Sequence, residues 1–527
     1  MLIATRPHDL AASLPAATLP GRLRGVAAEH PGDEALIEGT TRLTYAELLS
    51  RSESFAAALR EGGLATGDVV LIQLPNWWET VVAVWGTWLA GGVVLPVVPI
   101  YRGHELAFII AEADPAVLVA PETYRGHHHA SELRELAPEL LVVGVRMGSD
   151  LPGIRPFETM QSSGPSPEVT VEPDDIALVL YTSGTTSAPK GALHSHRTLL
   201  AESASIRDAC RLTGIDRIFM PSPLSHITGL SYAIVLPADI GAAAVLLDRW
   251  EPEIAMGLIE EERCTFTVSA TPFLRGLTET YAASTAPRSS LRTFICGGAD
   301  IPPDLVRRAH AVMSAAVIRT YGSTELPTLA MADPFGDLDA AADCEGGVIG
   351  GNEMTVRAVE EGVSELLARG PELFLGYVDA SLNEASFTED GWFRTGDTAT
   401  IDDDGLLRIS GRIKDIINRG GEKYSAGEVE WALLAHPAVA EVAIVGYPDE
   451  SLGERACAFV VPTEMGPPDL ADLRAHLLAA GFAVQKSPER LEIVMQLPRT
   501  ASGKIQKFRL RDGLGLVASP TELESRA

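Results

Sequence analysis

Cysteine is scarce in this sequence. Only five of its 527 residues are cysteines, and no two of them stand in a CxxC spacing. They are Cys210, Cys264, Cys296, Cys344 and Cys457. An odd number without paired spacing supports neither a disulfide framework nor a zinc cluster. The N-terminus also lacks the basic segment and the apolar stretch of a secretory signal. We therefore expect a cytoplasmic protein.

Lysine and arginine are also few relative to the acidic residues. Lysine and arginine together number 42, against 71 aspartates and glutamates, which leaves a formal net charge of −29. A chain with this excess of negative charge is repelled by a nucleic-acid backbone and by an anionic membrane surface. We therefore expect no nucleic-acid partner. A polyanionic ligand would need positive charge gathered locally at its site.

A clear membrane span is missing too, although one segment comes close. The run Val81–Ile100 carries no charged residue and has the length of a spanning helix. Gly91-Gly92 would weaken a helix, and Pro96 would interrupt its second half. The run therefore predicts a buried helix through Leu89, a turn, and a strand at Val93–Val98. We expect no membrane span.

Length and hydrophobic patterning predict an α/β protein. At 527 residues, a prior of about 150 residues per domain suggests about three packed units. Short β-branched runs alternate with longer amphipathic stretches such as Tyr45–Glu61 and Pro303–Met313, the pattern of parallel sheets covered by helices. The predicted strands are Val69–Leu74, Ile176–Tyr181, Thr265–Ala270, Arg292–Cys296 and Ala315–Tyr321.

The pattern changes beyond Gly411, where shorter elements of both kinds alternate. The predicted helices are Ala426–Ala435 and Asp469–Ala480, and the predicted strands are Val439–Val445, Ala456–Val461 and Leu491–Gln496. These suffice for a small separate domain. We predict a large N-terminal domain, residues 1–411, of helix-covered, mainly parallel sheets, and a small α+β domain, residues 412–527.

The most informative segment comes directly after the predicted strand that ends at Tyr181. It reads YTSGTTSAPKG over Tyr181–Gly191. Small hydroxyl residues around a glycine allow N–H and O–H groups to converge on phosphate oxygens, and Lys190 adds positive charge. The loop differs from the GxxxxGK[ST] motif because Pro189 precedes the lysine and Gly191 comes after it. We predict a polyphosphate-binding loop; a flexible surface turn is the alternative.

Six further motifs occur in order along the chain. They are Pro223–His226 (PLSH), Gly297–Ala299 (GGA), Tyr321–Glu325 (YGSTE), Thr395–Asp397 (TGD), Gly411–Asp415 (GRIKD) and Pro498–Lys504 (PRTASGK). With the phosphate loop, they make the chain resemble the adenylate-forming enzymes. This family includes acyl-CoA synthetases, firefly luciferase and the adenylation domains of nonribosomal peptide synthetases. The resemblance extends from about residue 20 to about residue 512, and seven ordered motifs are far more specific than one loop.

The resemblance implies that ATP, with Mg²⁺, converts a carboxylic acid to an acyl-AMP, which then reacts with coenzyme A as co-substrate. Attack of a carboxylate on the α-phosphate brings two anions together, so the site must supply positive charge. The implied catalytic residues are Lys504, Thr185, Glu325 and Lys190. Glu325 would hold the Mg²⁺, and Lys504 would reach the site only when the small domain closes.

The same resemblance implies a set of nucleotide-binding residues. Tyr321 and the Gly297–Ala299 backbone would enclose adenine, and Asp397 and Arg412 would hold the ribose. The full set is Thr182, Ser183, Gly184, Thr186, Gly297, Gly298, Ala299, Tyr321, Gly322, Thr324, Asp397 and Arg412. An isolated aspartate in such a turn is usually a turn residue. The role of Asp397 therefore depends on the other motifs.

Two histidine positions need separate interpretation. His226 matches a family position between the acyl pocket and the thiol tunnel, and we assign it to substrate binding rather than to acid–base catalysis. A satisfied core histidine is the alternative. The run His127-His128-His129 has no partner motif, and we interpret it as a solvated turn rather than a metal site.

The acid is expected to be apolar. Amino-acid-activating members of the family have an acidic residue where this chain has Ile227, so an α-amino acid is disfavoured. The candidate substrate-binding residues are His226, Ile227, Gly229, Leu230 and Phe273, with Thr271, Ala299 and Leu326 as further wall positions. Mostly apolar walls predict an aliphatic, alicyclic or aryl carboxylic acid. They do not specify chain length or ring type.

The acceptor is expected to be a phosphopantetheine thiol. The segment Asn418–Lys423 resembles both aryl-acid CoA ligases and enzymes that load an acid onto a carrier protein. We favour free coenzyme A because the sequence shows no attached carrier domain, and a stand-alone enzyme that loads a carrier protein is the alternative. A non-catalytic nucleotide-binding protein of the same fold is a second alternative, although Lys190, Glu325 and Lys504 are all retained. The chain could be a monomer or a homodimer.

The small domain is expected to be a mobile lid. One active site must first present Lys504 to ATP and then remove it so that the thiol can approach. Lys414, in the segment that joins the domains, matches the hinge position of the family. We therefore predict a hinge near Lys414, with an exposed linker lysine as the alternative.

Overall fold

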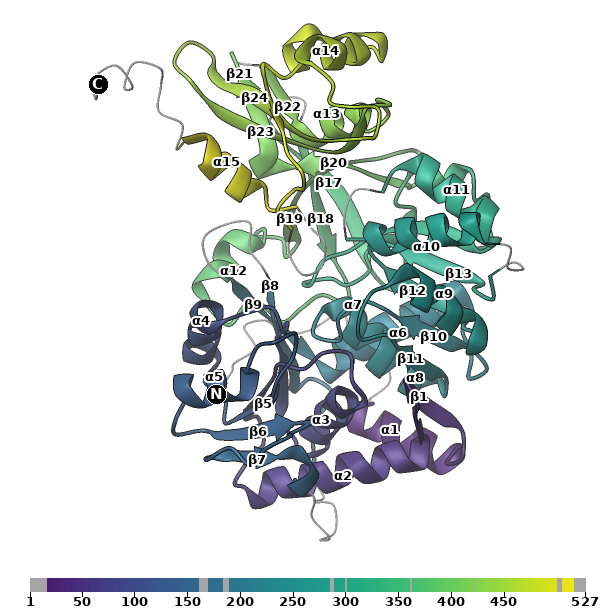
Figure 1. Cartoon of the computed structure of the whole chain (residues 1–527), viewed down its shortest axis with the longest axis vertical. Coiled ribbons are helices and arrows are strands. Elements are labelled where there is room, and N and C mark those ends of the chain that lie inside the picture. The colour runs from purple at the N-terminus through teal and green to yellow at the C-terminus, as the bar shows by residue number, and fades with distance from the viewer. Residues whose placement is uncertain are drawn as a thin grey trace. The chain divides into compact units, whose positions relative to one another are not determined.

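The computed structural model describes residues 17–160, 169–182, 189–284, 289–298, 301–360, 363–420, 422–499 and 505–515. The chain forms two compact units (Figure 1). Unit 1 contains the chain up to Thr182 together with Pro189–Glu353 and Arg369–Phe387, and unit 2 contains Met354–Ala368 and the chain from Thr388 onward.

A nine-stranded sheet forms one half of unit 1. Its strand order is β16-β15-β14-β13-β12-β10-β11-β1-β2. In chain order the strands are β1 (Glu34–Glu38), β2 (Thr41–Thr44), β10 (Arg217–Met220), β11 (Ala243–Leu246), β12 (Phe266–Ser269), β13 (Thr293–Cys296), β14 (Ala316–Tyr321), β15 (Ala330–Met331) and β16 (Gly347–Val348). The strands from β14 to β1 in this order pair in parallel. The predicted strands near residues 265, 292 and 315 thus lie side by side.

A seven-stranded sheet forms the other half, in the order β7-β6-β5-β3-β4-β8-β9. Its strands are β3 (Val69–Ile72), β4 (Val93–Pro96), β5 (Val117–Pro121), β6 (Leu141–Val145), β7 (Ile154–Pro156), β8 (Ile176–Thr182) and β9 (Lys190–Ser195). All neighbours pair in parallel except β8 and β9, which are antiparallel. The two predicted strands at 69–74 and 176–181 are confirmed as β3 and β8.

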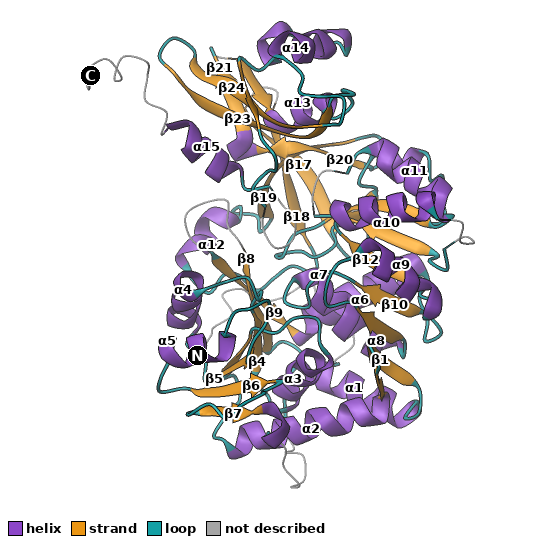
Figure 2. Cartoon of the chain, in the orientation of Figure 1, coloured by secondary structure: helices purple, strands orange, loops and turns teal. Residues whose placement is uncertain are grey.

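Helices cover both sheets of unit 1 (Figure 2). They are α1 (Leu19–Glu29), α2 (Tyr45–Glu61), α3 (Trp78–Leu89), α4 (Gly103–Ala113), α5 (His129–Leu136), α6 (His196–Cys210), α7 (Ile227–Leu230), α8 (Leu236–Ile240), α9 (Pro252–Glu261), α10 (Thr271–Ala283), α11 (Pro303–Met313) and α12 (Ser381–Ser386), with a π-helical turn η3 (Ser231–Val235) and short 3₁₀ turns η2 (Phe157–Thr159) and η4 (Ala340–Asp343). Local signals set some boundaries: α2 begins where Thr44 and Glu47 form a capping box.

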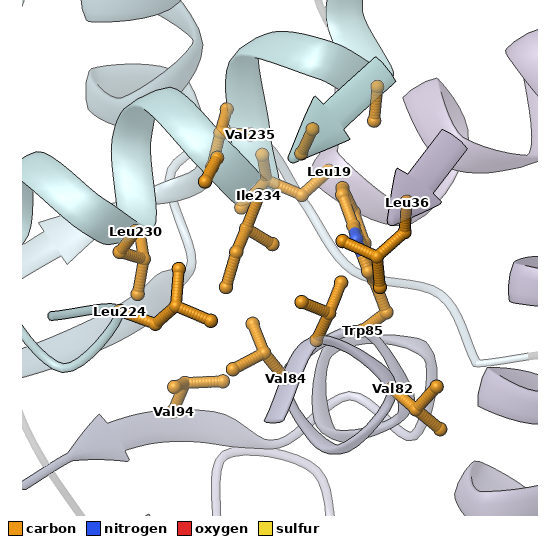
Figure 3. Packing of buried hydrophobic residues seen from close by; sticks show 14 of the residues in the cluster. Leu19, Leu36, Val82, Val84, Trp85, Val94, Leu224, Leu230, Ile234 and Val235 are labelled. Atoms are coloured by element: carbon orange, nitrogen blue, oxygen red, sulfur yellow. The ribbon is translucent and has the colours of Figure 1, made fainter. Parts of the chain in front are cut away.

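The largest core cluster lies between the two sheets of unit 1. It joins Leu36 of the nine-stranded sheet and Val94 of the seven-stranded sheet with helices that include α3. Figure 3 shows Trp85 of α3 among these residues, near the α7–η3 segment that carries Leu230. Two further clusters lie on the outer faces, one under α9, α10 and α11 and the other under α4 and α5. Unit 1 therefore has alternating layers of helices and sheets, as predicted.

The uncharged run Val81–Ile100 folds as predicted. It contributes α3, which ends at Leu89, and β4, which begins at Val93. Every residue of α3 from Glu79 to Leu89 is buried, so its apolar surface packs against protein. Within the described part of the chain, no helix is both long and apolar enough to cross a membrane. The five cysteines are free and buried, so they form no disulfide with one another.

Unit 2 has two sheets. The four-stranded sheet has the order β17-β18-β19-β20, from β17 (Glu353–Glu360), β18 (Val363–Arg369), β19 (Phe393–Ile401) and β20 (Leu407–Arg412). The other sheet has the order β22-β21-β24-β23 with β25 paired to β24, from β21 (Ile416–Arg419), β22 (Glu422–Ser425), β23 (Val439–Asp449), β24 (Gly453–Pro462) and β25 (Arg490–Ile493). Helices α13 (Ala426–Leu433), α14 (Leu470–Ala479) and α15 (Lys507–Gly515) and the 3₁₀ turns η5 (Ile413–Asp415) and η6 (Val484–Lys486) complete the described part.

The second sheet with its helices is the small α+β domain that the sequence predicts. Its core joins Val429 of α13, Ile444 of β23 and Leu473 of α14. The four-stranded sheet belongs to the same compact unit, because its strands are joined to the rest of unit 2 through β20 and η5. The predicted domain boundary at residue 411 and the predicted hinge near Lys414 stay predictions.

Candidate functional site

Several predicted site residues come after neighbouring parallel strands of unit 1. Strands β10, β12, β13 and β14 run in parallel, so their carboxyl ends meet at one edge of the sheet. Tyr321 is the last residue of β14, and the residues that come after these strand ends are His226, Thr271, Phe273, Gly297, Gly298, Gly322, Thr324 and Glu325. In open α/β sheets, ligands bind at this edge. The topology therefore brings the adenine, magnesium and acid positions to one edge.

The loop after β14 is tightly folded. The Ser323 backbone N–H donates to the Leu326 carbonyl at 2.9 Å, and the Ser323 hydroxyl accepts from the Glu325 N–H at 3.2 Å. Gly322 is required by close approach, because a Cβ there would lie 1.8 Å from the Pro327 carbonyl oxygen. Residues 322–328, which we call the Glu325 loop, are thus held by their own hydrogen bonds and packing.

Two other segments bind the backbone of the Glu325 loop. His194 of β9 is buried, and its Nε2–H donates to the Thr324 carbonyl at 2.7 Å. The Phe374 N–H donates to the Glu325 carbonyl at 2.8 Å. The Glu325 side chain itself is only partly buried. Its backbone is therefore anchored from both sides while its carboxylate stays accessible.

Tyr377 connects two of the predicted catalytic residues, and the sequence analysis missed it. Its hydroxyl donates to Glu325 Oε1 at 2.6 Å, and Lys190 Nζ lies 5.2 Å from its ring centroid, within cation–π range. Burial and then the negative charge of Glu325 raise the pKa of Tyr377, so the phenol stays neutral and donates. Lys190, Tyr377 and Glu325 thus form one cluster.

Tertiary pairing places Tyr377 there. The chain from Leu375 to Val378 runs along β9, with Leu375 N–H to Leu193 carbonyl at 2.7 Å and Leu193 N–H to Gly376 carbonyl at 3.0 Å. An isolated bridge pairs Ala192 with Tyr377. No motif near residue 377 indicates this pairing, and the aromatic residues Phe374 and Tyr377 are the only local signal.

Four of the predicted substrate-binding residues lie in or next to α7: His226, Ile227, Gly229 and Leu230. His226 caps this helix, because its Nδ1 accepts from the Thr228 N–H at 3.4 Å. Ile227 is buried in the large core cluster, and so is Leu230 (Figure 3). A Cβ at Gly229 would lie 2.1 Å from the Pro223 carbonyl oxygen, so the helix packs closely on that segment. Whether these residues also line an acid pocket stays a prediction.

Phe273 offers the one large aromatic surface among the predicted acid-side residues. Its ring lies edge-on to Trp250, with centroids 4.7 Å apart, and its side chain is half-buried. Edge-to-face packing is a preferred arrangement of aromatic rings and stabilises this orientation. Phe273 could therefore present a fixed apolar face to a ligand.

In unit 2, Asp397 and Arg412 form an ion pair. Arg412 Nε lies 2.8 Å from Asp397 Oδ1, and the two residues stand opposite each other in the β19–β20 pairing. Asp397 is buried, and its N–H donates to the Thr395 hydroxyl at 3.1 Å. Lys414 lies in η5, directly after β20. The two residues predicted to hold the ribose thus lie together, and the ribose contact itself stays a prediction.

Six of the predicted site residues lie outside the described part of the chain. They are Ser183, Gly184, Thr185 and Thr186 of the phosphate loop, Ala299 and Lys504. The ends of the phosphate loop are described: Thr182 pairs with Lys190 across β8 and β9. Near Lys504, Arg499 forms an isolated bridge with Ile505. Lys504 itself remains a prediction from its motif.

The histidine run differs from its predicted solvated turn. His129 is fully buried at the start of α5, with Nδ1 3.2 Å from Gln73 Oε1. Burial, then the neighbouring His127 and Arg102, lower the pKa of His129 to about 4, so it is neutral at pH 7. The prediction of a solvated turn is therefore wrong for His129. Among the described residues, no group of three or more histidine, cysteine, aspartate or glutamate side chains could hold a metal ion.

Comparison with known proteins gives consistent similarities along the chain. The family described as "AMP-binding enzyme" matches residues 23–378, and "AMP-binding enzyme C-terminal domain" matches residues 428–504. The medium-chain fatty-acid–CoA ligase of Escherichia coli K12 is 34% identical over 89% of this chain and 85% of that protein. The salicylyl-CoA synthase / salicylate adenylyltransferase of a Streptomyces species is 34% identical over 92% of both chains. The solved structure of ATP-bound MatB from Rhodopseudomonas palustris is 28% identical, with a TM-score of 0.85 over 96% of this chain and 100% of that one.

Proposed function

The chain belongs to the AMP-binding enzyme family, and from this premise we propose that it activates a carboxylic acid with ATP and then transfers the acyl group to coenzyme A. The observation that carries the proposal is the cluster of Lys190, Tyr377 and Glu325 at the carboxyl edges of β8 and β14, one strand from each sheet of unit 1. A cation and a carboxylate at such an edge are suited to a nucleotide polyphosphate with its metal.

The reaction has two steps. In the first, a carboxylate oxygen of the acid attacks the α-phosphorus of ATP, and the bond to the bridging oxygen breaks to release pyrophosphate. In the second, the thiol sulfur attacks the acyl carbon, AMP leaves, and the thiol proton passes to solvent or to AMP. The first step joins two anions, so Lys190 and Lys504 would stabilise the charge that develops.

Mg²⁺ fits the donor set around Glu325. The carboxylate accepts one hydrogen bond at Oε1 from Tyr377 and retains further lone pairs. The described residues contain no cage of three or more such ligands, which suits a Mg²⁺ held by one carboxylate and the phosphates of ATP. Bound there, the ion would neutralise charge on the phosphate oxygens. Tyr377 would keep the Glu325 carboxylate oriented toward it.

The remaining nucleotide contacts are those that the motifs imply. Thr182, with Ser183 to Thr186, and Thr324 would bind the phosphates. Tyr321, Gly322 and the backbone from Gly297 to Ala299 would hold adenine, and Asp397 with Arg412 would hold the ribose.

The acid is an apolar one. The buried Ile227 and Leu230 and the half-buried Phe273 support apolar walls near His226, and no carboxylate stands at 227 to bind a substrate ammonium group. By their names, the two relatives act on a medium-chain fatty acid and on salicylate, one an aliphatic and one an aryl acid. We therefore propose an aliphatic, alicyclic or aryl acid.

A carrier-protein thiol is the second candidate acceptor. The name of the Streptomyces relative includes both a CoA synthase and an adenylyltransferase, so a similar chain is named for adenylation as well as for thioester formation with coenzyme A. Incubation of the acyl-adenylate with coenzyme A and, separately, with a phosphopantetheine-bearing carrier protein distinguishes the two acceptors. We expect a thioester with coenzyme A.

Acid-dependent exchange of labelled pyrophosphate into ATP tests the first step. We expect exchange only with an apolar acid and Mg²⁺ present, and AMP and pyrophosphate in equal amounts once coenzyme A is added. A panel of fatty, alicyclic and aryl acids identifies the preferred class. Release of ADP instead of AMP would contradict the proposal, because it would mean transfer of the γ-phosphoryl group.

Asp397→Asn is expected to raise the KM for ATP by about 10- to 100-fold, because a hydrogen bond to a charged group contributes about 1.5–3 kcal/mol. The kcat at saturating ATP should stay within about threefold. Asp390→Asn is the matched control, since Asp390 pairs with Arg357 on the surface of the same unit and exposed pairs contribute little. An unchanged KM for ATP in folded Asp397→Asn would refute the ribose contact.

A further inference from the structure

Glu202 is a fully buried carboxylate that the proposed reaction does not use. It lies in α6 and is 0% exposed. Its Oε2 accepts the Thr328 N–H at 3.1 Å, and its Oε1 accepts the Thr328 hydroxyl at 2.8 Å and the Tyr232 hydroxyl. Three donors thus converge on one side chain. A buried ionised group is retained at a large desolvation cost unless such donors satisfy it.

Each partner of Glu202 belongs to a segment that carries a predicted subsite. Thr328 is the last residue of the Glu325 loop, three positions after Glu325 itself. Tyr232 lies in η3, which continues the α7 helix that His226 caps. A π-helical turn inside a longer helix is frequently found at a functional site. Glu202 therefore connects the Glu325 loop, which is predicted to face the phosphates, with the α7–η3 segment, which is predicted to face the acid.

A second buried carboxyl group stands close to this network. Glu372 is 0% exposed, and its Oε1 accepts the Ser205 hydroxyl at 2.5 Å. Burial, and then the negative charge of Glu202, raise the pKa of Glu372 well above its usual range. Glu372 is therefore a neutral acid that can donate a hydrogen bond to Glu202.

We propose that Glu202 is a positioning residue, which holds the Thr328 end of the Glu325 loop at a set distance from the α7–η3 segment. The inference rests on the proposed function, because it assigns the magnesium contact to Glu325 and the acid contact to the α7 segment. In-line attack needs the acid and the α-phosphate aligned, and a displacement of about 1 Å can cost about 100-fold in rate. Glu202 would prevent that displacement.

The two acceptor oxygens of Glu202 are needed for this role. A carboxylate only accepts hydrogen bonds, so it can satisfy the Thr328 N–H, the Thr328 hydroxyl and the Tyr232 hydroxyl together. A glutamine at 202 has the same shape but replaces one oxygen by an NH₂ donor. That donor would face one of the three donors, and the Thr328 N–H or a hydroxyl would lose its acceptor.

Glu202→Gln is expected to lower the kcat of pyrophosphate exchange at least about tenfold. The KM for ATP should stay within about threefold, since Asp397, Arg412 and Gly297, which are assigned to the ribose and adenine, lie outside the Glu325 loop. Thioester formation from supplied acyl-adenylate and coenzyme A should also stay within about threefold, because that step does not use the phosphates of ATP. Glu372→Gln is the matched control: it replaces a neutral acid by a neutral amide, and both half-reactions should stay within about twofold.

A second pair of variants keeps the test decisive if Glu202→Gln fails to fold. Thr328→Val removes the hydroxyl donor and keeps the shape, whereas Thr328→Ser keeps the hydroxyl. We expect exchange to fall in Thr328→Val and to be retained in Thr328→Ser, with thioester formation retained in both. Parallel loss of both half-reactions, or exchange as fast as in the parent, would overturn the positioning role. A parent without acid-dependent exchange would instead refute the proposed function.

Discussion

Lys504→Ala is expected to slow acyl-adenylate formation by about 10³-fold, or ~4 kcal/mol in barrier, while thioester formation from supplied acyl-adenylate stays within about threefold. The reason is the charge balance of the two steps. A lysine is needed where a carboxylate attacks a polyphosphate, and it is not needed where a thiol attacks an acyl carbon. The measurement is pyrophosphate exchange beside thioester formation, on the same preparation.

Lys486→Ala is the control for this variant. Lys486 lies in the same unit, and its Nζ pairs with Glu428 at 2.7 Å on the partly exposed surface. Loss of such a pair changes stability by at most about 1 kcal/mol, so both half-reactions should match the parent. Equal loss of both half-reactions in Lys504→Ala would show that the motif lysine has a different role.

Lys414→Pro is expected to retain acyl-adenylate formation within about threefold and to lose about 100-fold or more of thioester formation, ~2.7 kcal/mol or more in barrier. Proline fixes φ near about −65°, which matches the 3₁₀ turn in which Lys414 lies. The dihedral angle φ at residue 414 would therefore be fixed, and adenylation is retained if that angle suits the first orientation of the lid. A lid that must swing between the two steps would stop after the first.

Lys414→Ala separates the backbone from the charge. It removes the ammonium group but keeps the backbone free to rotate, so both half-reactions should stay within about threefold of the parent. If Lys414→Pro leaves thioester formation unchanged, the hinge assignment is wrong and Lys414 is a linker residue. If Lys414→Ala blocks thioester formation and Lys414→Pro does not, that step needs the lysine side chain and not a backbone rotation at residue 414.

Much of the fold could be predicted because its signals are local. The two long helices Tyr45–Glu61 and Pro303–Met313 have the bounds that their amphipathic patterns indicate. The break in the run Val81–Ile100 falls where the glycine pair and proline predict it. Hydrophobic periodicity and breakers act over a few residues, so they can be recognised without the rest of the chain.

The predictions from sequence were wrong or incomplete for residues whose neighbours come from distant segments of the chain. The turn at His127–His129 has polar neighbours in sequence, yet His129 is buried beside Gln73. Tyr377 meets Glu325 across 52 positions of chain. Glu202 meets Thr328 across 126 positions. No local pattern specifies such contacts, because they arise only when strands take their order in the sheet.

The sequence by itself determined the family, the α/β class and the residue types that the chemistry needs, because ordered motifs and periodic patterns are properties of the chain. Only the tertiary structure decided which of these residues share an edge of the sheet, that Tyr377 joins Lys190 to Glu325, and that a buried Glu202 links the Glu325 loop to α7 and η3. The physical reason is that parallel strands from separate parts of the chain must pair before their carboxyl ends can meet.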